Sequence, residues 1–430
     1  MSQTLFTRRE LLKLAAATGA IGTLGACASL QDSKTIGKVV VVGAGWGGTT
    51  AAKYLRVWSN GTIEVTLVDP AEAFVSCPIS NLVIGGSKTM ADITISYAGL
   101  DKYGVKRVRD TVTAIDAAKK EVRLAGGSTL SYDRLIVSPG IDFMYERVAG
   151  MTPAAQAAIL HGWKAGPQTV ALRKQLVDMP DGGVVVMSIP GAPYRCPPGP
   201  YERACQIAWY LKNNKPKSKL IVLDGNPDMV SKKPLFTRVF NEDYKGIIDY
   251  RVGAPVTEVD LKTRTFVTEI GDKVSGQVLN LIPPQRAADI ARQAGLITTN
   301  DRWCDVNWMT MESTKVPGVH VLGDATFPAP TMPKSGHMAN QHGKAAAAAI
   351  VEILSGRTVL APTMANTCYS FVNESAAVHV CSVHQYSEAK KTMEPVAGAG
   401  GISSQDRASW MLEGQYAFGW AQTVWADMLA

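Results

Sequence analysis

Four residues near the start of the chain have types and spacing suited to binding a dinucleotide. Gly43, Gly45 and Gly48 stand in a Gly-x-Gly-x-x-Gly pattern, and Asp69 ends the next strand-like segment. The first glycine of such a pattern makes a tight turn, the second leaves bare backbone for a pyrophosphate, and the third lets a helix pack on a strand. The acid accepts hydrogen bonds from ribose hydroxyls. The spacing therefore predicts a dinucleotide site.

Cysteines are the second group of residues that could carry chemistry, and the chain has seven. Paired cysteines form structural or redox-active disulfides in an oxidising compartment, whereas a single buried cysteine behaves as a small hydrophobic residue. Their spacing matches neither a metal site nor a Cys-x-x-Cys-His haem attachment motif. The residues alone leave both kinds of role open for Cys77, Cys196 and Cys368. We predict no catalytic role for Cys205, Cys304 and Cys381.

The segments around the glycine turn have the pattern of a βαβ unit. An apolar run at 38–42 precedes the turn, a helical stretch at 49–57 follows it, and a second apolar strand at 63–68 ends on Asp69. Continuous apolar strands joined by a helix are typical of a parallel sheet with both faces covered. We expect the glycine turn to place a phosphate at a helix N-terminus.

A second βαβ pattern lies later in the chain, with strands at 183–189 and 219–224 and a helix at 201–211. Its turn, residues 188–194, reads Ser-Ile-Pro-Gly-Ala-Pro-Tyr and lacks the three-glycine pattern. Pro190 has no N–H, and bulky residues occupy places where a pyrophosphate needs bare backbone. The second unit is therefore predicted to be an NAD-like domain that has lost NAD.

The first thirty residues have the pattern of an export signal. Arg8 and Arg9 precede a short apolar stretch at 14–24, and small residues around Cys27 follow it. This stretch is shorter than the roughly 20 apolar residues of a membrane-spanning helix. Paired arginines are typical of a twin-arginine signal, which predicts a periplasmic protein. An ordinary N-terminus and a lipoprotein site with lipid on Cys27 remain alternatives.

Composition narrows the classes of function. The formal net charge is +7, and no basic run is interleaved with aromatic residues, so nucleic-acid binding is not predicted. A weakly basic surface suits an acidic protein partner. Beyond the N-terminal stretch we find no segment long and apolar enough to cross a bilayer.

Two further motifs resemble those of flavoproteins with two dinucleotide-binding domains. Residues 132–140 read Tyr-Asp-Arg-Leu-Ile-Val-Ser-Pro-Gly and resemble the strand and turn that close the FAD domain. Residues 319–325 read Val-His-Val-Leu-Gly-Asp-Ala and resemble the second FAD motif, in which the acid binds the ribityl chain. By this resemblance the first site holds FAD.

Longer segments resemble one family in particular, the flavoprotein subunit of flavocytochrome c sulfide dehydrogenase. The likeness covers nearly the whole chain beyond the N-terminal signal. It includes the surroundings of Cys196 and Cys368 and the segments 51–54, 84–86, 163–166, 172–176, 280–287 and 332–336. It implies an α/β fold with two Rossmann-like domains of the disulfide-reductase-like flavoprotein type and a small C-terminal domain.

The resemblance also implies residue roles. The sulfur of Cys77 is expected to bond the flavin 8α carbon, and Cys196 and Cys368 are expected to form a redox-active disulfide beside the ring. Glu202 is a candidate proton acceptor, although it could equally be the first-turn acid of a helix. Lys334 is expected near the pyrimidine end of the flavin. Further implied cofactor contacts are Asn81, Val112, Pro139, Gly140, Gly323, Asp324 and Gly336.

The resemblance implies a domain order. Residues 1–30 form the signal and residues 151–285 the NAD-like domain. The FAD-binding domain comprises 36–150 and 286–358, and 359–430 form a C-terminal interface domain with scattered aromatic residues.

The implied activity is oxidation of sulfide to sulfur or polysulfide in the periplasm. Hydrosulfide opens the Cys196–Cys368 disulfide, FAD takes two electrons, and these pass singly to haem on a separate cytochrome c subunit. A sulfide:quinone oxidoreductase is the alternative, but it must dock on a membrane, and the C-terminal tail is mixed, with Glu413 and Asp427 among its aromatics. A binding module without turnover is disfavoured because the FAD motifs are intact.

Overall fold

The chain's first strand, β1 (Gly37–Val42), is a run of valines in which every residue except Lys38 is buried. Burial on both faces is typical of a parallel strand covered by helices. The strand belongs to a computed structural model that describes residues 35–430. The predicted twin-arginine signal and Cys27 lie outside the described residues.

The first sheet has seven strands, and two separate parts of the chain build it. β1 pairs in parallel with β2 (Ile63–Val68) on one side and with β9 (Arg134–Val137) on the other. The sheet continues on the β2 side with β5 (Lys106–Val108), and on the β9 side with β21 (Val319–Val321), β20 (Glu312–Ser313) and β19 (Val306–Asn307).

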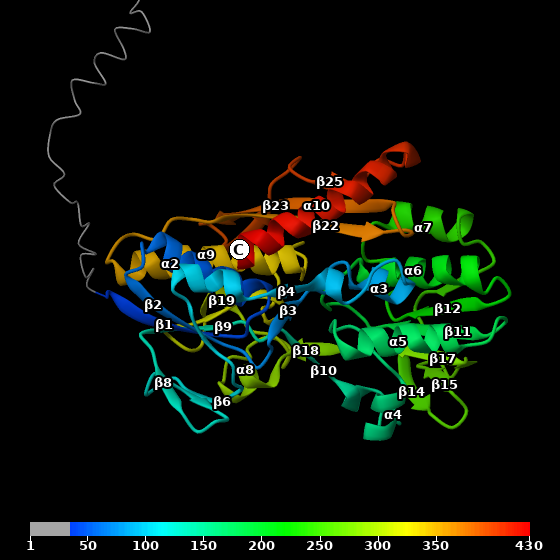
Figure 1. Ribbon diagram of the computed structural model, residues 1–430, viewed down its shortest axis with the longest axis horizontal. Helices are drawn as coiled ribbons and strands as arrows, with labels where there is room; N and C mark the ends of the chain where they lie inside the picture. The colour runs from blue at the N-terminus through cyan, green and yellow to red at the C-terminus, as the bar shows by residue number, and fades with distance from the viewer. Residues whose placement is uncertain (1–34) are drawn as a thin grey trace, which may run out of the picture. The chain divides into compact units, whose positions relative to one another are not determined.

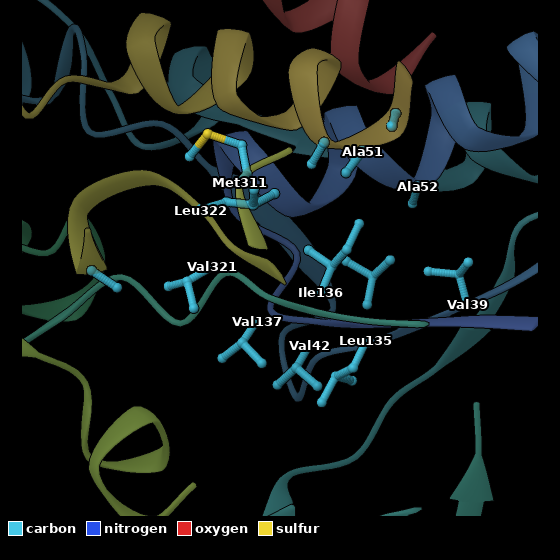
Figure 2. Close-up of a cluster of buried hydrophobic side chains, with 14 of the residues drawn as sticks. Val39, Val42, Ala51, Ala52, Leu135, Ile136, Val137, Met311, Val321 and Leu322 are labelled. Carbon is cyan, nitrogen blue, oxygen red and sulfur yellow. The ribbon is translucent and has the colours of Figure 1, made fainter. Parts of the chain in front are cut away.

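Two helices, α2 (Trp46–Trp58) and α9 (Gly336–Leu354), pack on each other beside this sheet. Figure 2 shows Ala51 and Ala52 of α2 above the strand residues Val39 and Ile136 in the main hydrophobic core. All four side chains are buried. Small side chains on α2 allow it to pack closely on the sheet, and this packing positions the loop between β1 and α2.

The second sheet has four parallel strands in the order β13 (Ile248–Arg251), β12 (Lys219–Asp224), β11 (Val184–Ile189) and β17 (Val278–Leu281). Figure 1 shows it on the right, with the helices of this part of the chain in green. These helices are α5 (Pro167–Asp178), α6 (Gly199–Asn214) and α7 (Lys233–Glu242). A three-stranded meander packs against the sheet itself and is formed by β14 (Val256–Asp260), β15 (Thr265–Thr268) and β16 (Lys273–Ser275).

The C-terminal part consists of a long hairpin and one helix. The strands β22 (Thr363–Phe371) and β23 (Ala377–Ser387) are antiparallel, and α10 (Trp410–Leu429) lies across them (Figure 1). β22 contacts both α9 of the first sheet's layer and α6 of the second. Side chains of β22 therefore reach the boundary between the two sheets. β24 (Thr392–Pro395) and β25 (Gly401–Ile402) pair with the other side of β23.

Short elements complete the described part of the chain. The two sheets are connected by the antiparallel pair β10 (Ile141–Phe143) and β18 (Gln285–Ala287). α3 (Ser80–Gly85) packs on α5 and α6. The others are β3 (Ala73–Val75), β4 (Thr94–Ser96), the meander β6 (Val112–Asp116), β7 (Glu121–Leu124) and β8 (Thr129–Ser131), and the helices α4 (Pro153–Ala158) and α8 (Asp289–Gln293). Within residues 35–430 no helix combines the length and apolarity needed to cross a membrane.

The predicted fold class is confirmed, and the strands 63–68 and 219–224 have the predicted ends. Both helices of the βαβ units begin earlier than predicted, at Trp46 instead of 49 and at Gly199 instead of 201. Glycine and proline fill these first turns, and their low intrinsic helix propensity hides the helix start in a sequence pattern.

Candidate functional site

The three glycines of the first turn meet three different surroundings. Gly43 has φ +95°, and a Cβ there would lie 2.3 Å from the carbonyl oxygen of Ser138. A Cβ on Gly48 would lie 1.8 Å from the carbonyl oxygen of Gly43, so the helix packs directly on the turn. A Cβ on Gly45 would meet nothing within 4 Å. Gly45 thus presents bare backbone to open space, as a pyrophosphate site requires.

Asp69 lies beside this turn, at the end of β2. Its carboxylate accepts hydrogen bonds from the backbone N–H groups of Ala44 (2.7 Å) and Ala71 (2.8 Å). Asp69 and Tyr97 both line a cavity of about 430 Å³. Val112, also predicted to touch the cofactor, packs against the main core at the start of β6 and is not part of this lining.

The second FAD motif supplies a partly buried acid with spare hydrogen-bonding capacity. The Oδ1 atom of Asp324 is inaccessible to solvent, and burial raises the pKa of the carboxyl. Its Oδ1 atom has no hydrogen-bond partner within the described residues. Gly323, with φ +67°, and Gly140, with φ +69°, make the turns nearby, and Gly140 follows Pro139 directly. An acceptor left in this state fits a ligand that brings hydroxyl donors, such as the ribityl chain of FAD.

Lys334 is a buried cation next to this acid. Its Nζ donates to the carbonyl oxygens of Asp324 (3.0 Å) and Thr326, and it lies 3.6 Å from the ring centroid of Trp303. Burial lowers the pKa of Lys334 to about 7. Two residues on, a Cβ at Gly336 would lie 2.9 Å from the Trp46 ring, so glycine lets the start of α9 approach the glycine-turn helix.

One pocket brings together the three cysteines singled out in the sequence, and we call it the cysteine pocket. Cys77 enters it from the loop before α3, Cys196 from the loop before α6, and Cys368 from β22. Each carries a free thiol in the structure. The lining also includes Asn81, Trp163, Arg195, Glu202, Arg203, Gly336, His337 and Trp420.

The backbone at Cys196 is strained. Its φ of +58° is in the left-handed region, which non-glycine residues rarely adopt. The Cys196 N–H donates to the carbonyl oxygen of Lys334 (2.7 Å), and its own carbonyl accepts from the Gly199 N–H (2.9 Å). A Cβ at Gly199 would lie 2.8 Å from the Cys196 sulfur. Strain held by specific contacts is typical of functional positions.

Cys77 has a cationic partner that the sequence analysis missed. The Arg195 guanidinium donates to the Cys77 sulfur at 2.7 Å and also to the carbonyl oxygen of Trp163. The Ala165 N–H approaches the same sulfur at 3.5 Å. Arg195 immediately precedes Cys196, so one short segment supplies both the cationic partner of Cys77 and the second cysteine of the pocket.

Glu202 lies in the first turn of α6 and is buried. One of its oxygens accepts from the Asn81 side-chain amide and the other from the Phe371 N–H, both at 2.8 Å. Burial raises the pKa of Glu202, and these hydrogen bonds oppose that rise. Asn81 and Glu202, predicted independently as a cofactor contact and a proton acceptor, are thus direct partners.

Two further buried cations were missed by the sequence analysis. The Arg203 guanidinium donates to Asn81 Oδ1 (3.1 Å) and to the carbonyl oxygen of Gly162 (2.6 Å). Lys232 donates to the carbonyl oxygen of Cys368 (2.9 Å). Lysines and arginines are mostly exposed, so burial of these two could not be read from their types.

The acid that ends the second βαβ unit, Asp224, accepts hydrogen bonds from residues of its own domain. Asp224 is fully buried and accepts from the hydroxyls of Tyr201 (2.9 Å) and Tyr250 (2.7 Å). The Asn226 side-chain amide donates to Asp224 (2.7 Å) and to the Pro190 carbonyl (3.1 Å). The position where an NAD ribose would bind is therefore filled by protein side chains.

Three family models match the chain. They are pyridine nucleotide-disulphide oxidoreductase over residues 37–178, the central part of the sulfide dehydrogenase [flavocytochrome c] flavoprotein chain over 169–283, and flavocytochrome c sulphide dehydrogenase, flavin-binding, over 360–429.

Two curated proteins illustrate the similarity. The sulfide dehydrogenase [flavocytochrome c] flavoprotein chain of Chlorobaculum thiosulfatiphilum is 59% identical over 46 residues, which cover 94% of that sequence and 11% of this chain. The mitochondrial sulfide:quinone oxidoreductase of Mus musculus is 25% identical over 327 residues, 74% of this chain and 71% of that protein.

Solved structures share the fold. The sulfide:quinone oxidoreductase of Aquifex aeolicus has a TM-score of 0.73 at 17% identity and covers 91% of each chain. The putidaredoxin reductase in its covalent complex with putidaredoxin has a TM-score of 0.63 at 17% identity and covers 89% of this chain and 93% of its own.

The glycine turn with Asp69, the buried Asp324 acceptor and the flavin-binding match at 360–429 all point to a FAD enzyme. Together with the match over 169–283 and the 59% identical relative, they show that the chain belongs to the family of sulfide dehydrogenase (flavocytochrome c) flavoprotein chains, which are FAD-dependent oxidoreductases.

Proposed function

We propose that this chain oxidises sulfide at a Cys196–Cys368 disulfide and passes the electrons through FAD to a cytochrome c subunit. The observation that carries the proposal is the cysteine pocket, because it collects Cys77, Cys196 and Cys368 from three distant parts of the chain. The family match over 169–283 and 360–429 supports the same chemistry.

FAD would be held at both ends by residues already described. Gly43, Gly45 and Gly48 would face its pyrophosphate, Asp69 its adenosine ribose and Asp324 its ribityl hydroxyls. Cys77 is proposed to form a covalent bond to the flavin, a tether that would prevent cofactor loss in the periplasm. Bound there, FAD would supply a two-electron acceptor that can give up electrons singly.

The residues of the cysteine pocket would divide the sulfide chemistry among them. Hydrosulfide attacks one sulfur of the disulfide, so that one S–S bond forms, another breaks, and a thiolate leaves. The thiolate and the persulfide sulfur would then lose two electrons to FAD as a new S–S bond forms between them. Glu202 is proposed to take the proton released as the new persulfide ionises, since it lines the cysteine pocket and burial raises the pKa of its carboxyl.

The proposed electron acceptor is a protein and not a nicotinamide. The Asp224 carboxylate, where an NAD ribose would bind, has Tyr201, Tyr250 and Asn226 as partners. Opening that position would leave a buried charge without hydrogen bonds, which is costly. This argues against a nicotinamide acceptor. The family match supports a separate cytochrome c subunit, and the paired Arg8 and Arg9 support a periplasmic location.

The test is anaerobic addition of sulfide to the purified FAD-loaded protein. We expect the visible flavin absorbance to bleach, and we expect Cys196→Ser to abolish bleaching while FAD stays bound. Cys381→Ser is the matched control, because Cys381 is partly exposed and outside the cysteine pocket. Bleaching by the Cys196→Ser protein would refute the disulfide route.

Sulfide:quinone oxidoreductase activity is the second candidate, because the Mus musculus and Aquifex aeolicus proteins of that name share the fold over most of this chain. Re-oxidation of the reduced flavin by cytochrome c and by a quinone analogue separates the two candidates. We expect cytochrome c to be faster, and a faster reaction with the quinone would replace the proposed acceptor. Yellow colour retained after acid precipitation would support the bond to Cys77.

A further inference from the structure

Lys232 is a buried cation that is hydrogen-bonded to the backbone of Cys368. The side chain is 4% exposed. Its Nζ donates to the carbonyl oxygens of Cys368 (2.9 Å) and Val378 (3.0 Å) and to the hydroxyl of Ser370 (2.8 Å). The Lys232 ammonium thus links β22 to β23 next to Cys368.

This position is unfavourable for a lysine in three respects. Burial of a charged group costs free energy unless it is paired. The backbone of Lys232 has φ +52°, in the left-handed region. The residue also immediately precedes α7 (Lys233–Glu242), and the N-terminus of a helix carries partial positive charge. A residue that lies at such a position, despite the free-energy costs of burial and strain, is a candidate for a functional role.

The charges around Lys232 indicate what that function is. Burial lowers the pKa of Lys232 to about 8, and the nearby Cys368 and Glu202 oppose the fall, so the ammonium is mostly protonated at neutral pH. Burial raises the pKa of the Cys368 thiol, and the Lys232 ammonium is the largest opposing influence, followed by the Asn366 side chain. Asn366 lies 3.5 Å from the Cys368 sulfur.

The other sulfur of the pair is in a different electrostatic environment. Burial raises the pKa of the Cys196 thiol, and the negative charges of Cys368 and Glu202 raise it further, against an opposing effect of Arg195. After burial, the largest influence on Cys368 is the Lys232 cation, which favours a thiolate, whereas the largest influences on Cys196 are negative charges, which disfavour one. In thiol–disulfide exchange the sulfur with the lower pKa leaves faster.

We propose that Lys232 is a positioning residue that makes Cys368 the leaving sulfur when sulfide opens the Cys196–Cys368 disulfide. The inference rests on the proposed function. Hydrosulfide bonds to the Cys196 sulfur, the bond between the two cysteine sulfurs breaks, and its electron pair stays on Cys368 as a thiolate. The step consumes one hydrosulfide anion and forms one thiolate anion on Cys368, so charge and electrons balance.

The first test uses the unaltered, FAD-loaded chain. After reduction of the disulfide, the rate of alkylation by iodoacetamide is followed at each cysteine as a function of pH, with mass spectrometry to separate the sites. We expect the midpoint for Cys368 to lie at least about one pH unit below that for Cys196, a tenfold difference in thiolate at fixed pH. Equal midpoints, or a lower midpoint for Cys196, would overturn the proposal.

The second test removes the charge. Lys232→Met is expected to raise the Cys368 midpoint by about one pH unit and to slow flavin bleaching by sulfide about tenfold at pH 7. Lys232→Gln, which keeps an N–H donor for the carbonyls but has no charge, should act in the same direction. The glutamine variant therefore tests the effect of the charge if the methionine variant does not fold. Lys232→Arg should restore the low midpoint.

Lys215→Met is the matched control. Lys215 is also a buried lysine, and its Nζ donates to the carbonyl oxygens of Val177 (2.6 Å) and Met179. It is not part of the cysteine pocket. We expect that variant to keep the Cys368 midpoint and to bleach at a rate within about twofold of the unaltered chain, a difference of less than about 0.5 kcal/mol.

The two proposals fail in different ways. If sulfide does not bleach the flavin of the unaltered chain, the proposed function is wrong. If bleaching is normal but the Cys368 midpoint is the same with and without the Lys232 charge, only the role of Lys232 is wrong.

Discussion

At the scale of single residues, Gly45 and Gly48 separate cofactor binding from folding. A Cβ at Gly48 would lie 1.8 Å from the Gly43 carbonyl oxygen, whereas a Cβ at Gly45 would meet no protein atom within 4 Å. We expect Gly48→Ala to lower the free energy of unfolding by roughly 2 kcal/mol or more, because α2 must move. Gly45→Ala should fold normally but bind FAD about tenfold more weakly, since its methyl group enters the predicted pyrophosphate site.

Both substitutions are best measured in a Cys77→Ser background, in which FAD is expected to exchange. Urea unfolding of the cofactor-free protein gives the stability, and FAD titration gives the affinity. Equal loss of stability in the two variants would show that Gly45 is also a packing glycine. Unchanged FAD affinity in the Gly45→Ala protein would show that the pyrophosphate does not bind at Gly45.

At the scale of secondary structure elements, the start of α9 ties the first sheet to the C-terminal hairpin. Ser335 caps this helix, since its Oγ accepts from the Met338 N–H (3.0 Å), and the same hydroxyl donates to the Asn366 side chain (2.6 Å). Asn366 in turn contacts the Cys368 sulfur. We expect Ser335→Ala to cost about 1 kcal/mol of stability and also to slow sulfide-driven flavin bleaching several-fold.

Thr152→Ala is the control for that prediction. Thr152 caps α4 by accepting from the Ala155 N–H at 3.3 Å, and it does not line the cysteine pocket. It should lose a similar free energy in urea denaturation while bleaching at the normal rate. If both variants bleach normally, the contact from Ser335 to Asn366 has no bearing on the chemistry.

At the scale of the whole molecule, buried neutral histidines make the fold sensitive to acid. Burial lowers the pKa of His161 to about 3, of His320 to about 4 and of His342 to about 3, against 6.5 for an exposed imidazole. Below pH 6.5 the unfolded chain binds protons at these sites and the folded chain does not. Stability should therefore fall as pH drops from 6.5 toward 4, by up to about 1.4 kcal/mol per pH unit for each histidine.

Thermal or urea unfolding at pH 7, 6 and 5 measures this dependence. Replacing one of the three, as in His320→Gln, should reduce the slope between pH 6 and pH 5 by nearly one proton, or about 1.4 kcal/mol per pH unit. An unchanged slope in that variant would mean that His320 is already protonated in the folded protein.

Local patterns were enough to predict the elements and their chemistry near the first turn. Gly43, Gly45, Gly48 and Asp69 are close in sequence, and the turn that they build depends on backbone sterics within one βαβ unit. The acid Asp324 was identified in the same way, from a short motif that resembles known flavoproteins. The structure then added what a motif does not contain, namely that the Oδ1 atom of Asp324 is buried and has no hydrogen-bond partner within residues 35–430.

Longer-range relations came only from the tertiary structure. Cys196 and Cys368 were paired by resemblance to a family, because nothing in their spacing says that β22 packs against α6. The partnership of Asn81 with Glu202 also joins segments far apart in the chain.

The sequence by itself determined the two βαβ units and the first nucleotide turn, because strand period, glycine geometry and helix packing act between neighbours along the chain. Only the tertiary structure decided which charged side chains lie around the cysteines. Arg195, Arg203 and Lys232 look like ordinary surface cations in the sequence. Their influence on a thiol depends on distance and on the exclusion of water, and both quantities exist only once distant segments have packed together.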